Sequence, residues 1–273
     1  MDMNERVAVV TGAASGIGRA TARALAEQGA LGVVVADMDA GGVADTVAAI
    51  EAGGHQALGV TADVSREADV QDLIAAAEAA YGRVDLFFSN AGIIVDGGVE
   101  VSDEAWSRIW AVNVQSHVYV ARALLPSVVR RGEGYLVITA SAAGLLTELG
   151  SAPYSVTKHA AVALAEWLSI TYGDQGLRVS CLCPQAVSTN LIATSSQQVS
   201  GMSPVRDSLG GPQASVDGVL TADDVARTVL EAVADERFLI LPHPEVATYE
   251  QRRAGDRDRW LRGMRRLQAR LRG

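Results

Sequence analysis

The chain has 273 residues, of which 49% are hydrophobic, and it carries a formal net charge of −9. Two cysteines exclude a disulfide framework, and no apolar run reaches the ~20 residues that span a bilayer. We therefore expect one large domain, of a size that α/β folds often reach undivided, in the reducing cytoplasm and with no membrane partner.

The charge is unevenly distributed. Residues 250–273 contain nine arginines and three acidic residues, a net charge of +6, which leaves −15 on the rest. An acidic body argues against nucleic acid as a partner. The tail also carries a helical apolar stripe, made of Trp260, Leu261, Met264, Leu267 and Leu271. This pattern predicts a helix packed on an acidic body, its own or a neighbour's, or else a membrane-surface or nucleic-acid contact.

Apolar runs alternate with helical patterns along residues 1–242. Short runs rich in Val, Leu, Ile and Phe, typical of strands buried on both faces, occupy residues 6–10, 32–36, 57–61, 84–89, 134–139, 177–183 and 237–241. Helical periodicity occupies residues 16–29, 39–52, 66–81, 103–131, 152–173 and 221–234, with Ser65 and Ser102 as plausible N-caps. The alternation predicts one α/β domain over 1–242, with a parallel sheet and helices on both faces, and a helical extension over 243–273. Residues 188–218 are polar and aperiodic, which indicates a lid.

Three glycines, Gly12, Gly16 and Gly18, follow the first strand and open the first helix in TGAASGIG. Bare backbone at a helix N-terminus lets a pyrophosphate approach, although a tight turn without a ligand is the alternative. Asp37 ends the second strand, where a carboxylate can bind ribose hydroxyls and repel a 2′-phosphate. Ser15 and the neighbours of Asp37 carry no positive charge, so we expect NAD(H) rather than NADP(H).

Tyr154 and Lys158 lie one helical turn apart. An ammonium beside a phenol favours the phenolate and makes it a usable acid or base, although the same spacing also occurs on exposed helix faces. Ser141 follows a strand, where ligands bind in open α/β sheets. Asn90 closes the fourth strand. Asn113 lies within the long helical pattern, either buried and satisfied by backbone or water, or on a solvated face.

Together these motifs resemble the short-chain dehydrogenase/reductase family over about residues 5–242. The resemblance implies a seven-stranded, doubly wound Rossmann-like sheet and NAD-dependent interconversion of a secondary alcohol and a ketone. It implies catalysis by Asn113, Ser141, Tyr154 and Lys158: Tyr154 as general acid/base, Lys158 lowering its pKa and binding the nicotinamide ribose, Ser141 orienting the substrate oxygen, and Asn113 holding a water. It also implies a cofactor site made of Gly12, Ser15, Gly16, Ile17, Gly18, Asp37, Asp63, Val64, Asn90, Ala91, Gly92, Tyr154, Lys158, Pro184, Val187 and Thr189. A homotetramer or homodimer is the expected assembly.

One departure from the family pattern concerns the substrate. Gln185 replaces a glycine after the sixth strand, so its amide either binds a polar substrate group or points to solvent. With Ser141 and Leu149 it forms our expected substrate contacts, and Leu145 and Leu146 favour a hydrophobic, aromatic or steroid-like substrate. Four scattered histidines indicate no metal site. The alternatives are a non-catalytic nicotinamide-binding regulator and, within the family, a carrier-linked 3-ketoacyl reductase.

Overall fold

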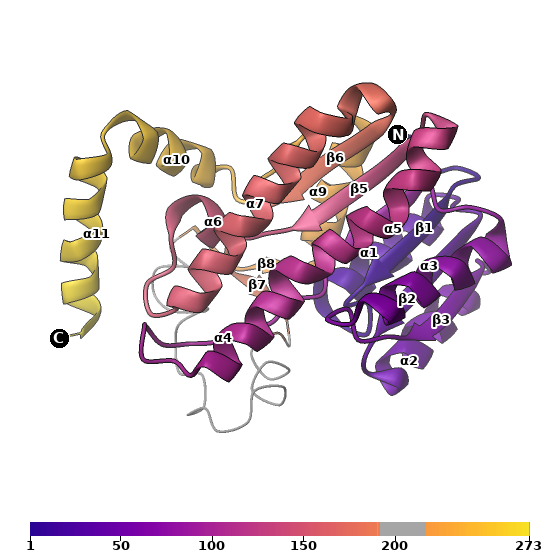
Figure 1. Cartoon of the computed structure of the whole chain (residues 1–273), viewed down its shortest axis with the longest axis horizontal. Helices are drawn as coiled ribbons and strands as arrows, with labels where there is room; N and C mark the ends of the chain where they lie inside the picture. Colours follow the sequence, from indigo (N-terminus) through magenta and orange to yellow (C-terminus); the bar gives the residue numbers. More distant parts are fainter. Residues whose placement is uncertain (190, 192–216, 273) are drawn as a thin grey trace.

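A seven-stranded parallel sheet organises the chain (Figure 1). The computed structural model describes residues 1–189, 191 and 217–272. The strand order is β3-β2-β1-β4-β5-β6-β9. The strands are β1 (Val7–Thr11), β2 (Gly32–Asp37), β3 (Ala57–Thr61), β4 (Leu86–Ser89), β5 (Gly134–Thr139), β6 (Leu177–Leu182) and β9 (Leu239–Ile240). The chain winds outward from β1 to β3 and then crosses to β4, so the order reverses between β1 and β4. The predicted doubly wound sheet is confirmed.

The register explains why these runs lack polar alternation. Val9 pairs with Val34 in β2 and with Phe87 in β4, and all three side chains are buried. Successive strand residues point to opposite faces, so each strand needs apolar side chains on both. Val9 and Phe87 belong to the core on one face, whereas Val10 and Phe88 belong to the core on the other.

Helices cover both faces of the sheet. The core that contains Val9 includes buried residues of α3 (Glu67–Tyr81), α5 (Ser116–Arg131) and α7 (Ala152–Tyr172). The core that contains Val10 includes buried residues of α1 (Gly16–Glu27), α2 (Ala40–Ala52) and α9 (Ala222–Ala234). Figure 1 shows α5 and α7 in front of the sheet and α9 behind it. The helices thereby leave the carboxyl edge of the sheet open.

The helix predicted over 103–131 is interrupted. It comprises α4 (Asp103–Trp110), a π-helical turn η1 (Ala111–Gln115) and α5. Ser102 is the N-cap of α4, as predicted, and accepts a hydrogen bond from the Ala105 amide. The N-cap prediction for Ser65 is wrong, because Arg66 is the N-cap of α3 and the Ser65 hydroxyl donates to Asp63 instead.

The described residues form several further elements. They are α6 (Ala143–Leu146), the 3₁₀ turn η2 (Gly173–Gln175), β7 (Val187–Ser188), β8 (Leu220–Thr221), α10 (Glu245–Gly255) and α11 (Arg257–Arg272). Val187 pairs with Leu220, so β7 and β8 bring together the two ends of the predicted lid. Residues 190 and 192–216 of that lid lie outside the described residues. None of the described helices is long and apolar enough to cross a membrane.

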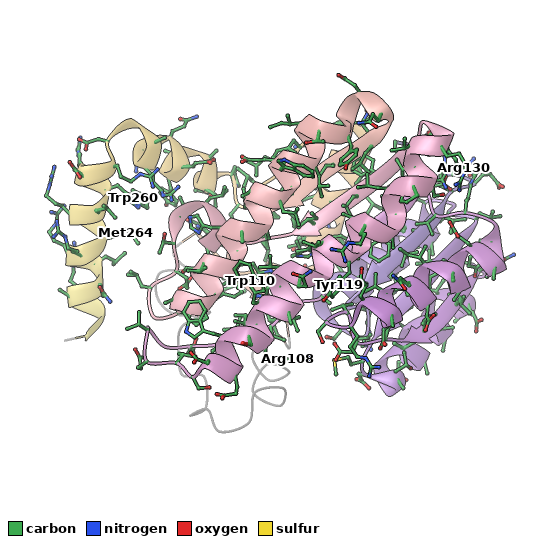
Figure 2. The ribbon with its side chains drawn as sticks, viewed as in Figure 1. Arg108, Trp110, Tyr119, Arg130, Trp260 and Met264 are labelled. Atoms are coloured by element: carbon green, nitrogen blue, oxygen red, sulfur yellow. The ribbon has the colours of Figure 1, made fainter. Side chains whose placement is uncertain are left out.

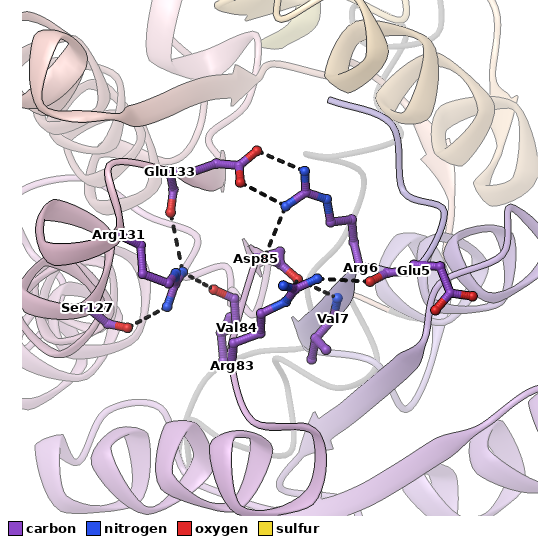
Figure 3. A network of polar contacts seen from close by, with 9 residues as sticks. All are labelled: Glu5, Arg6, Val7, Arg83, Val84, Asp85, Ser127, Arg131 and Glu133. Carbon is purple, nitrogen blue, oxygen red and sulfur yellow. Dashed lines mark hydrogen bonds and ion pairs between the residues drawn. The ribbon is translucent and has the colours of Figure 1, made fainter.

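The amino edge of the sheet, opposite the open edge, is held by a polar network (Figure 3). Buried Asp85 accepts hydrogen bonds from the Val7 amide at 2.9 Å, from Arg83 at 2.8 Å and from Arg6 at 3.4 Å. Arg6 also forms a two-pronged pair with Glu133. This network joins the starts of β1, β4 and β5 and fixes their relative heights.

Candidate active site

One large cleft, about 1030 Å³ in volume, opens at the carboxyl edge of the sheet. Most of the predicted site residues line it: Gly12, Ser15, Gly16, Ile17, Asp37, Asp63, Val64, Asn90, Ala91, Gly92, Ser141, Tyr154, Lys158, Pro184, Gln185, Val187 and Thr189. Gly18 and Asn113 do not line it and support it from behind. Leu149 was predicted to contact substrate, but it lines a separate, smaller hollow beside α11; Leu146 and Glu148 line the cleft in its place. The loop after α6 turns Leu149 away from the catalytic residues.

The glycine turn fits a close approach by a phosphate. Gly12 has φ +66°, and an added Cβ would lie 2.9 Å from the Cα of Ala91. A Cβ on Gly18 would lie 2.2 Å from the carbonyl oxygen of Gly12, so Gly18 lets the helix pack on the turn. Ser15 is the N-cap of α1 and makes no capping bond with its side chain. The turn therefore offers free donors at a helix N-terminus, the chemistry that binds a dinucleotide pyrophosphate.

The adenosine end of the cleft is acidic. Asp37 accepts a hydrogen bond from the Ala14 amide at 3.1 Å, which fixes its carboxylate beside the glycine turn. Asp63 accepts from the Ser65 hydroxyl and lies 3.5 Å from Arg108, and these contacts outweigh its burial and lower its pKa. Sequence reasoning missed Arg108, which comes from α4 and also reaches the Met38 sulfur at 3.7 Å. This guanidinium stands at the rim of the adenosine end.

Asn90 binds three strands together beneath the glycine turn. Its side-chain amide donates to the Thr11 carbonyl at 3.0 Å, and its Oδ1 accepts from the Thr139 hydroxyl at 3.1 Å. These bonds join the carboxyl ends of β1, β4 and β5 at the point where the strand order reverses. Such a switch point is where open α/β sheets bind ligands.

Asn113 lies at the centre of the π-helical turn and is fully buried, which excludes the solvated-face alternative. Its Oδ1 accepts from the Ile93 amide and its Nδ2 donates to the Ile93 carbonyl, both at 2.9 Å. A Cβ on Gly92 would lie 3.4 Å from both Asn113 Oδ1 and Lys158 Nζ. The π turn thus brings the asparagine close to the lysine.

Lys158 is buried beneath Tyr154. Its Nζ donates to the Thr139 carbonyl at 2.9 Å and lies 5.6 Å from the centre of the Tyr154 ring. Burial lowers the pKa of Lys158 to about 8. The ammonium therefore stands one helical turn from the phenol, as the spacing predicts, in a desolvated setting that the spacing does not reveal.

Tyr154 and Ser141 lie next to one another in the cleft and share a hydrogen bond. Burial raises the pKa of Tyr154 to about 12, while its hydrogen bond with Ser141 lowers it and the charge of Glu148 raises it. This departs from the lowered pKa that the family resemblance implies. In the chain alone burial prevails and the phenol stays protonated. Ser141 Oγ is held by the Ala143 amide at 3.1 Å.

Glu148 is a further cleft residue that sequence reasoning missed. The Ser155 hydroxyl accepts from the Glu148 amide at 2.9 Å and donates to its carbonyl at 3.1 Å, so Glu148 is clamped beside Tyr154. Its neighbour Thr147 has φ +81°, a strained conformation for a β-branched residue. Burial, together with the nearby Asp96, raises the pKa of Glu148 to about 7. No motif marks this residue, because its place depends on the turn that follows α6.

Gln185 lies at the substrate end of the cleft. The backbone N–H of Gln185 donates to His243 Nδ1 at 3.3 Å, which anchors the backbone there. Its side-chain Oε1 is buried and has no hydrogen-bond partner among the described residues. No cluster of three or more His, Cys, Asp or Glu that could hold a metal ion occurs in the described part of the chain.

Comparisons with known proteins agree with this geometry. The model of the short chain dehydrogenase family matches residues 6–200. The chain is 36% identical over 249 residues to a 1-deoxy-11-beta-hydroxypentalenate dehydrogenase from Streptomyces exfoliatus, covering 90% of this chain and 86% of the relative. It is 34% identical over 235 residues to a cis-4-hydroxycyclohexanecarboxylate dehydrogenase from Sinomonas cyclohexanicum, covering 84% and 94%. A short chain dehydrogenase/reductase from Burkholderia phymatum, solved in complex with NAD, superposes with a TM-score of 0.86 at 36% identity over 94% of this chain and 96% of that one. The chain belongs to the short chain dehydrogenase family.

Proposed function

We propose that this protein is an NAD(H)-dependent oxidoreductase that interconverts a secondary alcohol and a ketone. The observation that carries the proposal is the convergence of Ser141, Tyr154 and Lys158 in the same cleft as the glycine turn. Family membership supports oxidoreduction, and the complex of the Burkholderia relative with NAD supports the cofactor. Asp37 beside the turn favours NAD(H) over NADP(H), because a carboxylate repels a 2′-phosphate.

The residues divide the chemistry between binding and proton transfer. A bound nicotinamide cofactor supplies the hydride acceptor or donor. Ser141 holds the substrate oxygen, and Tyr154 moves its proton: the phenol donates in ketone reduction, and the phenolate accepts in alcohol oxidation. Lys158 holds a positive charge below the phenol, and the pair Lys158–Asn113 lies on the path by which the proton leaves.

The substrate that we propose is a hydrophobic alcohol with an aromatic, alicyclic or steroid-like ring. Leu146 and Gln185 line the substrate end of the cleft, where Leu146 supplies an apolar wall. The name of the Sinomonas relative describes an alcohol on a cyclohexane ring. We further propose a cytoplasmic homodimer or homotetramer, as is expected for this family.

The test is NADH absorbance with a panel of alicyclic, aromatic and steroid secondary alcohols and their ketones. Tyr154→Phe should reduce kcat by ~10²–10⁴-fold, the usual contribution of general acid–base catalysis. Tyr172→Phe, at the far end of the same helix, is the matched control and should retain activity. Equal rates for Tyr154→Phe and the unaltered chain would refute the assignment of the acid/base.

A further inference from the structure

The catalytic cleft has an outer wall contributed by the two C-terminal helices. Tyr249 and Arg252 of α10 line the cleft, and α11 adds Arg259, Trp260, Gly263, Met264, Arg266, Leu267 and Arg270. The same cleft contains Ser141 and Tyr154. A substrate bound at Ser141 therefore has this wall opposite it.

The wall is not packed against the domain. Val246 of α10 is fully buried, but no described side chain of α11 is buried. Figure 1 shows α11 standing apart from the sheet, at the end opposite β3. Trp260 and Met264 lie on the side of α11 that faces the domain (Figure 2). The predicted apolar stripe lies in α11, and α11 is not packed on the body of its own chain: α10 is anchored by Val246, while α11 stands across an open cleft.

One line of positive charge runs along the inner face of α11. At about 100° per residue, Arg259, Arg266 and Arg270 project within ~40° of one another, next to the apolar line formed by Trp260, Met264 and Leu267. These arginines form no ion pair with any described residue. Three unpaired guanidinium groups on one line repel one another, so an anion between them and the cleft would stabilise the arrangement.

The acidic groups of the cleft have other neighbours. Asp256 accepts from the Arg259 backbone amide at the start of α11, and Asp217 accepts from the Tyr249 hydroxyl at 3.0 Å. Glu148 is held beside Tyr154 by Ser155 and forms no ion pair with a described residue of α11. The three guanidinium groups are thus left for a ligand, and their planar fork of donors matches a carboxylate.

We propose that the substrate is an apolar hydroxy acid or keto acid, whose carboxylate binds the Arg259–Arg266–Arg270 line while its ring packs on Trp260, Met264 and Leu267. The carbinol or carbonyl carbon then lies at Ser141 and Tyr154. This inference rests on the proposed function, because it places the reacting carbon at the acid/base pair. In this proposal the arginine-rich tail selects anionic substrates.

The test compares a carboxylate with its neutral isostere by calorimetric titration of the NADH-loaded protein. Cyclohexanecarboxylate should bind at least ~10-fold more tightly than cyclohexanecarboxamide, the gain expected of a charge-assisted hydrogen bond. Replacement of Arg259, Arg266 and Arg270 by glutamine should bring this ratio close to one. The matched control replaces Arg257, Arg262 and Arg265, which do not line the catalytic cleft, by glutamine and should keep the ratio. A triple lysine variant of the inner line should keep part of it, which separates loss of charge from unfolding of α11.

Three results would overturn the inference: no preference for the carboxylate, equal loss in both glutamine triples, or a changed oligomer size in the inner triple with an unchanged ratio. Turnover of neutral alcohols by the unaltered chain tests the proposed function separately. An enzyme that is active on neutral alcohols and shows no carboxylate preference refutes the inference alone. A protein that selects the carboxylate but reacts with no alcohol or ketone refutes the proposed function.

Discussion

Glu148 makes the free energy of unfolding depend on pH, and its burial in the cleft sets the size of this dependence. Its pKa is raised from 4.5 to about 7, first by burial and then by Asp96. Folding therefore favours the protonated acid. No penalty exists below pH 4.5, the penalty grows between pH 4.5 and about 7, and it is complete above that range. The shift corresponds to an upper limit of about 3 kcal/mol, because each pKa unit is worth ~1.4 kcal/mol.

Glu148→Gln removes the ionisable group and keeps the shape of the side chain. We expect the variant to match the unaltered chain near pH 4.5 and to be more stable by up to about 3 kcal/mol at about pH 8. Urea denaturation at the two pH values measures the free energy of unfolding. Because the Glu148 charge raises the pKa of Tyr154, the variant should also shift the pH profile of alcohol oxidation to lower pH.

Glu78→Gln is the control, since Glu78 is an exposed acid on α3 and its substitution should not change the pH dependence. A stability difference between Glu148→Gln and the unaltered chain that is the same at both pH values would refute the reasoning. It would mean that folding does not raise the pKa of Glu148.

Three other substitutions test the two edges of the sheet. Gly18→Ala places a Cβ within 2.2 Å of the Gly12 carbonyl oxygen, so titration should show ~10–100-fold weaker binding of NADH. The control is Gly173→Ala, whose new Cβ meets no atom within 4 Å and should leave NADH binding unchanged. Asp37→Ser removes the charge that faces a 2′-phosphate and leaves Arg108 nearby, so the NADP⁺/NAD⁺ ratio of kcat/KM should rise at least ~10-fold. Unchanged preference would show that Asp37 does not select the cofactor. Asp85→Ala orphans the buried Val7 amide and should lower the free energy of unfolding by about 1–3 kcal/mol, against about 0.5 kcal/mol or less for the exposed Asp235→Ala.

The sheet and the cofactor turn were predictable because their signals are local. A strand such as β1, buried on both faces, reads as an unbroken apolar run, and Gly12, Gly16 and Gly18 are only six residues apart. The carboxyl ends of parallel strands meet at one edge, so residues that follow strands, such as Asn90 and Ser141, converge whatever the loops do.

The residues that escaped prediction owe their place to distant contacts. Arg108, for example, meets Asp63 across 45 residues of sequence. Periodicity predicted one continuous helix over residues 103–131 and did not reveal the π turn at Asn113. The pKa values of the site could not be predicted either. The spacing of Tyr154 and Lys158 shows that they are close, but not the burial that raises the pKa of Tyr154 and lowers that of Lys158.

The contacts of the C-terminal tail were also beyond what the sequence pattern could predict. Amphipathic periodicity predicted a helix but left its partner open, because the apolar stripe of α11 fits any apolar or acidic surface. In the structure, the direction of α11 is set at one residue. Asp256 adopts an extended conformation, φ −148° and ψ 90°, and ends α10. Since α10 is anchored by Val246 and α11 contacts α10, the backbone angles of Asp256 set where the arginine line stands relative to Tyr154. The reach of the substrate pocket therefore depends on a single junction that no periodicity in the sequence reveals.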